Sequence, residues 1–571
     1  MIGRRLLSRH SNACGYRRYG GAMLFALHAL LVLLLVACAP LAPDARTPVT
    51  VKIFAFNDFH GHLAPPPGGV MVPDPDAREG GKLVPAGGVE HLATLLGTLR
   101  KDHPHHAVVS AGDLIGATPL MSSIYNDEPT IEVMNRLGLD FNGVGNHEFD
   151  RGTAELLRLQ NGGCAPDGCK SGVEYSGARF KFLAANVIVR NTRKPLFPAY
   201  GIKDFGGVRV AFAGVTLQGT SALVPAAGIA GVDFIDEVDA VNRLIPEIKA
   251  QGVAAIVVLL HQGGAQRGGH YNSCADFSGP VVEIARRLDP AVAVVVSGHT
   301  HQSYICRLHG KLVTSAGSYG RLLTEISMTL DARTGGVLAT DAGNHVVATH
   351  LAKDPALTEL IARYAAGLAS QAHGVVGRIA ESFSPVPDRN GESALGKLIA
   401  DAQLEATATA GAVLAFMNPG GVRAPLVFRE NGAVTYGELF AVHPFGNTLV
   451  TMTLTGAQLL EALELQWLTA RPRLLYVSRG FSYEWDPRAP PGRRIVAGSV
   501  SLHGKALEPA ARYRVTVNNF LAEGGDGFSV FTQGEQQVKG NTDIDAMTEY
   551  LGHHAAVRPD PSARVIARSN P

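Results

Sequence analysis

The sequence lacks a surplus of charge of either sign. Its 571 residues contain 51 Lys and Arg against 50 Asp and Glu, and charged residues make up only 18% of the chain. A protein that binds nucleic acid needs a basic face to neutralise phosphates, so this balance argues against a nucleic-acid polymer as partner. Hydrophobic residues reach 46%, which excludes a disordered chain. At roughly 100–200 residues per domain, the length predicts two to four domains.

The N-terminal apolar run is too short to span a bilayer. Residues 22–37 are apolar except for His28, and a transmembrane helix needs roughly 20 such residues. Basic residues precede the run, so residues 1–37 are predicted to form a secretory signal peptide. This segment holds five arginines and no acidic residue, and its removal changes the net charge from +1 to −4.

The apolar run ends in Leu35-Val36-Ala37-Cys38, which resembles a bacterial lipobox. Lipidation of Cys38 is expected, with residues 38–48 forming the lipidated cysteine and a Pro-rich tether. The residue after the cysteine is Ala39 and not Asp. By analogy with lipoprotein sorting in Gram-negative bacteria, the protein is expected on the periplasmic side of the outer membrane. Membrane contact is then expected only through this lipid anchor. Ordinary signal cleavage, giving a soluble periplasmic protein, is the alternative.

Cysteine is scarce, with six in the chain. Cys14 is removed with the signal peptide, and Cys38 is the expected lipidation site, so four cysteines remain. An even number of cysteines in an exported protein indicates disulfides. Cys164 and Cys169 flank a short Gly, Pro and Asp loop and are expected to pair, which leaves Cys274 with Cys306. A zinc knuckle is the alternative, but the spacing between the two pairs is too long for one.

No internal repeat and no long low-complexity tract divides the mature chain. In residues 49–350, β-rich runs alternate with helical patterns, which is typical of a layered α/β or α+β domain. Residues 351–373 are predicted to form a helical linker and residues 374–567 a second α/β domain. The Pro- and Gly-rich stretch 65–85 is predicted to be a surface loop. Two domains with a helical linker suggest hinged closure.

The elements expected in the first domain alternate regularly. The strands are residues 49–56, 107–110, 141–144, 208–215, 253–260 and 291–297, and the helices are residues 89–100, 130–137, 237–251 and 281–288. The linker helix is expected over 355–369. The second domain is expected to contain a helix over 393–410 and strands over 412–417 and 448–454.

Side chains that bind metals follow five of the expected strands. In chain order they are Asp58, His60, Asp113, Asn146, His261, His299 and His301. A lone Asp or His at a strand end is usually a cap or a turn former, but five such sites, mostly beside glycines, predict one cluster at one edge of the sheet. Imidazole and carboxylate without thiolate favour a hydrolytic centre of two divalent metal ions, Zn, Mn, Co or Fe.

The five blocks resemble the calcineurin-like metallophosphoesterases: Asp58-Phe59-His60, Gly112-Asp113, Gly145-Asn146-His147-Glu148, His261 and Gly298-His299-Thr300-His301. The resemblance implies a four-layer α/β/β/α sandwich. It also implies a ligand set for each metal ion. The first ion would be bound by Asp58, His60, Asp113 and His301. The second would be bound by Asp113 as the bridge and by Asn146, His261 and His299.

In this family a histidine contacts the transferring phosphoryl group, and the resemblance assigns that role to His147, with Asp150 orienting it. Two dications lower the pKa of bound water from about 15.7 towards roughly 7, so metal-bound hydroxide is expected to attack phosphorus in line. His147 would stabilise the transition state or assist the leaving group, with Asp150 fixing its tautomer. The alternative for Asp150 is the N-cap of a helix over 151–159.

Four blocks of the second half resemble the 5'-nucleotidase C-terminal domain. They are residues 395–402 (LGKLIADA), 418–423 (NPGGVR), 443–447 (HPFGN) and 519–528 (NFLAEGGDGF). Together with the metal domain, the resemblance covers about residues 49–567. On these motifs the chain is identified as a member of the bacterial 5'-nucleotidase/UDP-sugar hydrolase family.

The resemblance also implies a set of nucleotide-binding residues. Phe445 and Phe520 would sandwich the base, and stacking is worth about 1–3 kcal/mol per base. Asp526 would bind ribose hydroxyls, Asn418 the base edge, and Arg423 the phosphate or carboxylate-like groups. For each phenylalanine the alternative is a core aromatic.

Three positions depart from the family pattern. Pro419 stands where members commonly have Gly, and it lacks an N–H that could bond substrate. The arginines that relatives carry before the Leu-Gly-x-Leu block are absent, and Arg389 is the nearest candidate. The preference among monophosphates, diphosphates, cyclic nucleotides and nucleotide sugars therefore stays open. His301 stands where several nucleotidases have Gln or Asn, and it restores the general metallophosphatase ligand set.

The expected function is an exported hydrolase that releases phosphate from 5'-nucleotides in nucleotide catabolism, acting as a monomer on a small-molecule nucleotide. The alternatives are a 2',3'-cyclic-nucleotide phosphodiesterase/3'-nucleotidase, a UDP-sugar hydrolase and a thiosulfate-metabolising relative. A further alternative is a surface lipoprotein that binds nucleotide or metal without turnover. The complete ligand set together with His147 argues against that last alternative.

Overall fold

The computed structural model describes residues 47–73, 81–368, 372–429, 431–468 and 472–568. The helices and strands belong to one compact unit, Pro48–Pro571. The expected signal peptide, Cys38 and most of the tether lie outside the described residues. Within those residues, no helix combines the length and the apolar character needed to cross a bilayer.

Two six-stranded sheets form the centre of the first half. The first sheet has the order β16-β15-β1-β4-β5-β6, with β1 Val49–Phe56, β4 His106–Ser110, β5 Phe141–Gly143, β6 Lys181–Leu183, β15 Leu322–Leu330 and β16 Val337–Val346. The second has the order β13-β14-β12-β11-β9-β8, with β8 Tyr200–Phe205, β9 Val208–Thr216, β11 Ala255–His261, β12 Val292–Ser297, β13 Ser303–Leu308 and β14 Lys311–Ala316.

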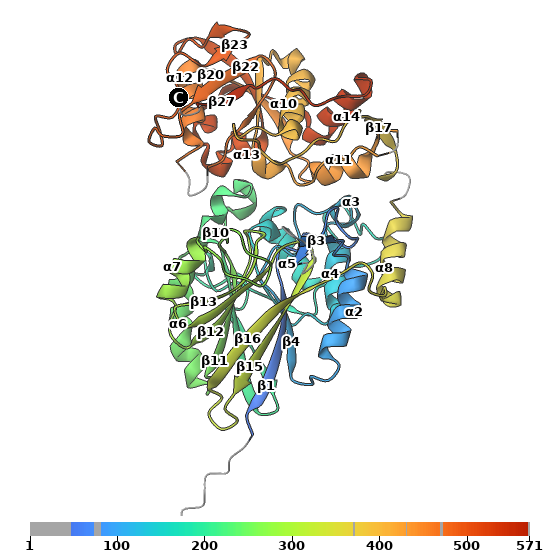
Figure 1. The fold of residues 1–571 in the computed structure, drawn as a ribbon, viewed down its shortest axis with the longest axis vertical. Coiled ribbons are helices and arrows are strands. Elements are labelled where there is room, and N and C mark those ends of the chain that lie inside the picture. The colour runs from blue at the N-terminus through green and yellow to red at the C-terminus, as the bar shows by residue number, and fades with distance from the viewer. Residues whose placement is uncertain (1–46, 74–80, 369–371, 430, 469–471, 569–571) are drawn as a thin grey trace, which may run out of the picture. The chain divides into compact units, whose positions relative to one another are not determined.

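Three hydrophobic clusters separate four layers. One cluster lies between the two sheets and includes Ile53 of β1, Phe212 of β9 and Leu259 of β11. A second packs the helices α2 (Val89–Arg100), α4 (Glu128–Leu137) and α5 (Gly152–Asn161) on the first sheet. A third packs α6 (Glu237–Ala250) and α7 (Pro280–Arg287) on the second sheet. In Figure 1, α2 and α4 lie on one side of the strands and α6 and α7 on the other. The α/β/β/α sandwich is confirmed.

The central strands are continuous apolar runs in the sequence, because helices cover one face of each sheet and the other sheet covers its second face. All seven residues of β11 are buried, and so are five of the eight residues of β1. Strand β1 and helix α2 have the predicted bounds, and the other expected strands and helices of this half are found with ends shifted by at most two residues.

The stretch 65–85 differs from the surface loop that its composition predicts. It contains a hairpin of β2 (Val70–Pro73) and β3 (Gly81–Val84), in which Val70 pairs with Val84. The valines of Val70-Met71-Val72 favour an extended backbone, and the prolines stand at the ends of the strand segments rather than within them.

The second half is built on a five-stranded sheet with the order β21-β18-β25-β20-β26. Its strands are β18 Leu414–Met417, β20 Thr448–Thr455, β21 Tyr476–Val477, β25 Arg512–Asn518 and β26 Glu535–Thr542. The helices are α10 Ala394–Ala406, α11 Tyr436–Val442, α12 Gly456–Leu465, α13 Asn519–Ala522 and α14 Asp543–His553. Buried clusters lie on both sides of this sheet.

Helix α10 is shorter than the helix predicted over 393–410. Ser393 caps its start, where the side chain accepts a hydrogen bond from the N–H of Gly396. The helix ends before Thr407, and a 3-10 turn over Ala408–Ala410 follows. The linker helix α8 (Pro355–Ala366) begins with Pro355 after the cap Asp354, and residues 369–371 lie outside the described part.

Short elements complete the chain. They are α3 Leu120–Ser123, β7 Val187–Val189, β10 Val232–Phe234, β17 Val375–Arg378, β19 Ala433–Thr435, β22 Phe481–Trp485, β23 Ser501–Leu502, β24 Lys505–Ala506 and β27 Val565–Ala567. The two expected disulfides are present, Cys164 with Cys169 and Cys274 with Cys306. Because each sulfur is bonded to its partner, the zinc-knuckle alternative is wrong.

Candidate active site

The candidate metal ligands lie at the carboxyl ends of strands in both sheets, not at one edge of a single sheet. Strands β1, β4 and β5 run parallel and are followed by Asp58 with His60, by Asp113 and by Asn146. In the second sheet β11 and β12 are parallel, and they carry the other three histidines. The carboxyl ends of the two stacked sheets therefore meet at one site. The spacing of the motifs in the sequence did not reveal that two different sheets supply the candidate ligands.

Six of these side chains form two groups with converging ligand atoms. One group contains Asp58, His60 and His301, and the other contains Asp113, His261 and His299; within each group the ligand atoms lie within 4.8 Å of one another. Asp113 Oδ2 lies 3.1 Å from His261 Nε2 and 3.6 Å from His60 Nε2, so this carboxylate stands between the groups. These are two candidate metal sites that share one carboxylate.

Asn146, the seventh predicted ligand, lies beside the second group. Its Oδ1 atom is 3.0 Å from His299 Nδ1 and 3.1 Å from His261 Nε2. The Asn146 amide oxygen therefore adds a fourth candidate metal donor to the two imidazoles and the carboxylate of this group. The structure thus brings all seven predicted ligands to one place.

Backbone carbonyls orient two of the imidazoles. His60 Nδ1 lies 2.8 Å from the carbonyl oxygen of Gly116, and His261 Nδ1 lies 2.8 Å from that of Ala111. A ring nitrogen that donates to a carbonyl fixes the tautomer and leaves Nε2 for a metal. Asp58 is held as well, since both of its oxygens accept from the N–H of His299 at 3.0 Å.

Five of the seven candidate ligands have a left-handed backbone. The φ angles are 49° at Asp58, 46° at His60, 51° at Asp113, 69° at His299 and 55° at His301. Residues other than glycine rarely adopt this conformation, and it persists where surrounding structure enforces it, commonly at functional sites. These turns allow the ligand side chains to converge across the ends of the strands.

Two glycines make room for the ligands. A Cβ atom on Gly145 would lie 2.2 Å from Asp113 Oδ1, and a Cβ atom on Gly112 would lie 2.7 Å from His261 Nδ1. Both distances are shorter than real contacts of a Cβ atom. The glycines of the sequence blocks are therefore required by the close approach of the ligand side chains.

The charges of Asp58, His60 and His301 fit bound divalent cations. Burial raises the pKa of Asp58 to about 7, so its ionised form needs positive charge nearby. Burial lowers the pKa of His60 and of His301 well below the ordinary value, and the Arg423 guanidinium contributes at both rings. Neutral imidazole is the form that binds a metal. At His261 burial is outweighed by the charge of Asp113, which raises the pKa to about 10, so a metal ion there would displace a proton. Two carboxylates and four imidazoles in one cluster are a donor set for two divalent cations.

Glu148 fixes the loops that carry the ligands, a role that the sequence did not reveal. Its carboxylate accepts from the N–H groups of Asp113, Leu114 and Gly145 at 2.7–2.9 Å, and from Asn142 Nδ2 at 3.2 Å. It therefore ties the turn after β4 to the turn after β5. The sequence shows Glu148 only as an acidic residue within the Gly145-Asn146-His147-Glu148 block, and that position does not indicate which groups its carboxylate binds.

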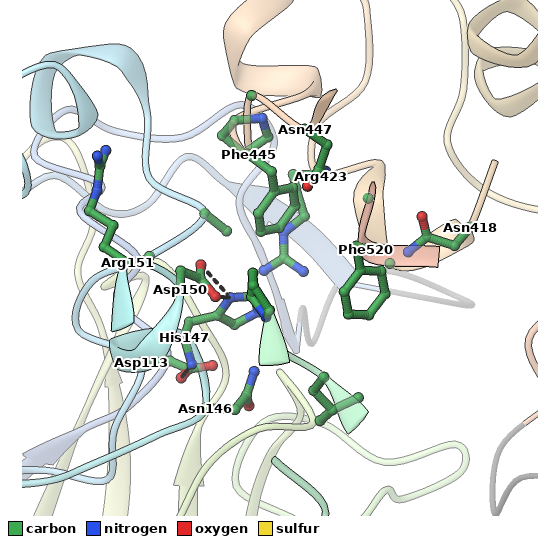
Figure 2. Close-up of a pocket in the computed structure, with 18 of the residues that line it drawn as sticks. Asp113, Asn146, His147, Asp150, Arg151, Asn418, Arg423, Phe445, Asn447 and Phe520 are labelled. Carbon is green, nitrogen blue, oxygen red and sulfur yellow. Dashed lines mark hydrogen bonds and ion pairs between the residues drawn. The ribbon is translucent and has the colours of Figure 1, made fainter. Parts of the chain in front are cut away.

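His147 and Asp150 form a hydrogen-bonded pair. His147 Nδ1 lies 2.9 Å from Asp150 Oδ2, and Figure 2 draws this contact. Burial lowers the pKa of His147, but the charges of Asp150 and Asp113 outweigh burial and hold that pKa above its ordinary value. Arg151 stands at the N-cap of α5, and no side chain caps the helix. Asp150 thus orients the imidazole and is not the helix cap.

A cavity of about 410 Å³ opens at the candidate metal sites, within the usual size range for small-molecule sites. Residues of both halves line it. The first half contributes, among others, Asp113, Asn146, His147, Asp150, Arg151, His299 and His301. The second half contributes, among others, Asn418, Arg423, Phe445, Asn447, Arg473, Phe520 and Asp526.

Phe445 and Phe520 line this cavity and are only partly buried, so neither is an ordinary core aromatic. The Phe445 ring lies 5.8 Å from the His147 ring, at 28° between their planes. Figure 2 shows both phenylalanine rings reaching into the space beside His147. Arg423 Nη2 lies 3.4 Å from His60 Nε2, and its Cζ is 6.0 Å from the centre of the Phe445 ring. A guanidinium therefore stands between an aromatic ring and the metal ligands.

Asp526 lies at the same cavity in a left-handed turn with φ 56° and is 5% exposed. Its Oδ1 atom accepts from Arg473, and its Oδ2 atom accepts from Asn418 Nδ2 at 3.0 Å. Asn418 Oδ1 in turn accepts from Asn518 Nδ2 at 2.9 Å. The carboxylate predicted to bind ribose is thus held by an arginine that belongs to none of the sequence blocks.

Arg389, the candidate phosphate clamp, is exposed and does not line the cavity. It lies in the turn that precedes Ser393, and the cavity is lined instead by Arg151, Arg423 and Arg473. Position in the chain suggested Arg389 because it is the arginine nearest to the Leu-Gly-x-Leu block. The turn directs residue 389 to solvent.

The fold and the site define a metallophosphoesterase with an added C-terminal domain. Residues 51–303 match the family model for calcineurin-like phosphoesterases, and residues 375–533 match that for the 5'-nucleotidase C-terminal domain. The crystal structure of a 5'-nucleotidase precursor from Thermus thermophilus has a TM-score of 0.75 and 30% identity, and the match covers 92% of this chain and all of that one. The chain belongs to the 5'-nucleotidase family and is a hydrolase of phosphoric esters.

Two sequence relatives extend the comparison. The cell wall protein Lmo0130 of Listeria monocytogenes is 32% identical, over 89% of this chain and 68% of its own length. Endonuclease YhcR of Bacillus subtilis is 32% identical over 514 residues, 89% of this chain. The chain spans 40% of the length of YhcR.

Proposed function

We propose that this protein is an exported 5'-nucleotidase, which hydrolyses nucleoside 5'-monophosphates to nucleoside and phosphate in nucleotide catabolism. The observation that carries the proposal is the composition of one cavity. Candidate metal ligands, the pair of His147 and Asp150, and the aromatic rings of Phe445 and Phe520 all line it. A nucleotide presents an anionic phosphate, a sugar and a flat base, and this cavity offers a complementary group for each.

The phosphate end is formed by the metal ligands and Arg423. When bound there, two divalent cations supply charge for the phosphoryl oxygens and make water nucleophilic near neutral pH. Arg423, whose guanidinium already lies 3.4 Å from His60 Nε2, binds a phosphoryl oxygen. Asp150 holds the His147 ring by Nδ1, so that Nε2 donates to the transferring phosphoryl group or to the leaving oxygen.

The nucleoside end is formed by residues of the second half. Phe445 and Phe520 stack on the two faces of the base, for about 1–3 kcal/mol per stacked base. Asp526 accepts the ribose hydroxyls, because each carboxylate oxygen can accept more than one hydrogen bond and, among the described residues, each accepts one. Asn418 retains one N–H for the base edge, since its other amide groups bond Asp526 and Asn518.

Export is supported by the two disulfides, since structural disulfides are rare in the cytosol. The basic and apolar segment 1–37 and the lipidation candidate Cys38 agree with this compartment. We infer attachment through a lipid on Cys38, with the folded domains outside the cytoplasm. Mass spectrometry of the mature N-terminus checks this, and an unmodified terminus would limit the proposal to a soluble exported protein.

One assay series tests the proposed activity. The first product of each substrate is measured for the purified mature protein with Mn, Zn, Co or Mg: phosphate from AMP, glucose 1-phosphate from UDP-glucose, a nucleoside monophosphate from 2',3'-cyclic AMP and p-nitrophenol from bis(p-nitrophenyl) phosphate. AMP is expected to be the best substrate. Preference for the cyclic nucleotide or for UDP-glucose would instead favour the phosphodiesterase or the sugar hydrolase. Inactivity of the metal-loaded protein on all four compounds would overturn the enzyme assignment. Asp113→Asn serves as the inactive control.

A further inference from the structure

A buried pair of ionisable residues lies behind the cavity wall. His443 Nδ1 is 3.2 Å from Asp543 Oδ2, and the two side chains are 1% and 0% exposed. His443 follows helix α11, and Asp543 is the first residue of helix α14. Neither residue lines the cavity, so the mechanism described above does not use them.

The surroundings of this pair are apolar. Val442, Leu439, Ile544 and Met547 belong to the buried cluster on this side of the sheet. Among the described residues, neither the two ring nitrogens of His443 nor the two carboxylate oxygens of Asp543 have a hydrogen-bond partner, so the two side chains are in close contact without hydrogen-bond geometry. Replacement of such a pair by apolar residues often leaves a protein equally stable. Stability alone therefore does not explain the pair, and a role in specifying local structure is the better explanation.

The pair anchors both ends of the loop that carries Phe445. At the first end, the His443 ring contacts the Asp543 carboxylate. At the other end, the N–H of Asp543 donates to the carbonyl oxygen of Asn447 at 2.8 Å. Between the anchors, Pro444 restricts the backbone and Gly446 has a left-handed φ of 61°. One residue of α14 thus holds a short, stiff loop at two points.

The same loop is joined to two other residues of the cavity. The N–H of Thr448 donates to Asn519 Oδ1 at 2.9 Å, and Asn519 directly precedes Phe520 in the chain. The N–H of Arg423 donates to the carbonyl oxygen of Val442 at 2.9 Å. A displacement of the loop would therefore move the Phe445 ring relative to the Phe520 ring and to the Arg423 guanidinium.

We propose that His443 and Asp543 are positioning residues for base recognition. Their contact sets the depth and tilt of the Phe445 ring, and thereby the width of the slot between Phe445 and Phe520. The inference rests on the proposed function, because it assigns the slot to the nucleotide base. It concerns binding of the base and not the chemical step, so it predicts a selective defect.

The test compares a substrate that has a base with one that lacks it. The full mature protein, loaded with metal, is assayed on AMP and on ribose 5-phosphate. His443→Leu is expected to raise the KM for AMP about tenfold, within the range for loss of one stacked base, with kcat little changed. The KM for ribose 5-phosphate is expected to stay within about twofold, since no base is present. An equal rise for both substrates would overturn the inference.

Two further variants separate positioning from folding. His443→Asn keeps a side-chain nitrogen near the place of Nδ1, within contact distance of the Asp543 carboxylate, and is expected to restore most of the AMP affinity. The double variant His443→Leu/Asp543→Leu removes the unpaired charge, so it is expected to recover the Tm of the unchanged protein while the KM for AMP stays high. If the double variant binds AMP as tightly as the unchanged protein, the pair does not position the loop.

A double-mutant cycle with Phe445→Ala locates the effect. When Phe445 is absent, His443→Leu is expected to change the KM for AMP by less than about twofold, because the pair acts through that ring. Full additivity of the two substitutions would show that the pair does not act through the Phe445 ring.

The two proposals fail on different results. If the protein without substitutions does not hydrolyse AMP, the proposed function is overturned. If that protein is active and its His443→Leu variant binds AMP normally, only the inference about His443 and Asp543 is overturned.

Discussion

Arg473 and Asp526 form an ion pair at the cavity, and this contact connects a residue outside every motif to the carboxylate that we propose binds ribose. Burial raises the pKa of Asp526, and Arg473 and Asn418 oppose that rise. The charge of this carboxylate therefore depends on the guanidinium. A ribose that donates two hydroxyl groups is best bound by an ionised acid, because a protonated one accepts less well.

Replacement of Arg473 should weaken nucleotide binding more at low pH than at high pH. Arg473→Gln removes a charge that lowers the pKa of Asp526, so that pKa rises further and the acid protonates at a higher pH. We expect the KM for AMP to rise about tenfold at about pH 6 and less at about pH 8, with kcat little altered. Steady-state kinetics across this pH range measure the difference.

Arg479→Gln is the matched control for that experiment. Arg479 is about half exposed and pairs with Glu405 away from the cavity, so its loss should leave the KM at both pH values within about twofold. An Arg473→Gln defect of equal size at both pH values would show that Arg473 acts through contacts other than the Asp526 charge.

Asp150→Asn should lower kcat with a small change in KM. The Asp150 carboxylate accepts from His147 Nδ1 at 2.9 Å, and in the proposed mechanism this bond orients the ring towards the phosphoryl group. An amide in its place can present its N–H₂ group to Nδ1 and stabilise the wrong tautomer. We expect a loss of about 10²-fold in kcat for AMP, in the range of a positioned acid or base. The circular dichroism spectrum and Tm of the variant serve as the folding control, and an unchanged kcat would remove Asp150 from the mechanism.

Local pattern predicted the strands and the residues that follow them, because both depend on neighbouring residues. Apolar runs such as the one before Asp58 give a buried strand whatever sheet it joins, and the polar residue after it must stand at the strand end. The assignment of strands to sheets depends on long-range pairing. The sequence therefore placed His261 and Asp58 at one sheet edge, although two stacked sheets supply them.

The residues missed by the sequence act through tertiary contacts. Arg473 reaches Asp526 across 53 positions of the chain, and no spacing rule marks such a contact. Glu148 was visible within its block, but its function is to bond backbone groups of the turn after β4, 34 and 35 positions away. Arg389 shows the opposite error, since nearness in sequence to a motif did not place it in the cavity.

Glu148→Gln should destabilise the protein even though the side chain keeps its shape. Three of the four groups that face this carboxylate are backbone N–H donors, and an amide presents a donor where an acceptor is needed. We expect a loss of about 1–3 kcal/mol in the free energy of unfolding, the cost of leaving a buried donor unpaired. Urea denaturation measures this loss.

Glu283→Gln is the control for the same change of side chain at the surface. Glu283 is more than half exposed and, among the described residues, forms its ion pair with Arg286 one turn further along α7, so its replacement should leave the midpoint of urea denaturation nearly unchanged. If Glu148→Gln proves as stable as this surface variant, Glu148 does not hold the two turns together.

Gly145→Ala should prevent metal binding while the fold persists. The added Cβ would lie 2.2 Å from Asp113 Oδ1, so the carboxylate between the two candidate sites must move. We expect the metal content, measured by atomic emission, to fall below that of the unchanged protein. We also expect the increase in Tm that the metal gives to the unchanged protein to shrink, because a ligand stabilises only the state that binds it.

Gly97→Ala is the control for the added methyl group. No atom lies within 4 Å of its Cβ, and alanine is the better helix former in α2 by about 1 kcal/mol. This variant should therefore keep its metals and gain slightly in Tm. A Gly145→Ala protein that binds as much metal as Gly97→Ala, with the full thermal shift, would contradict the assignment of Asp113 as the shared ligand, because the carboxylate cannot keep its place beside the new Cβ.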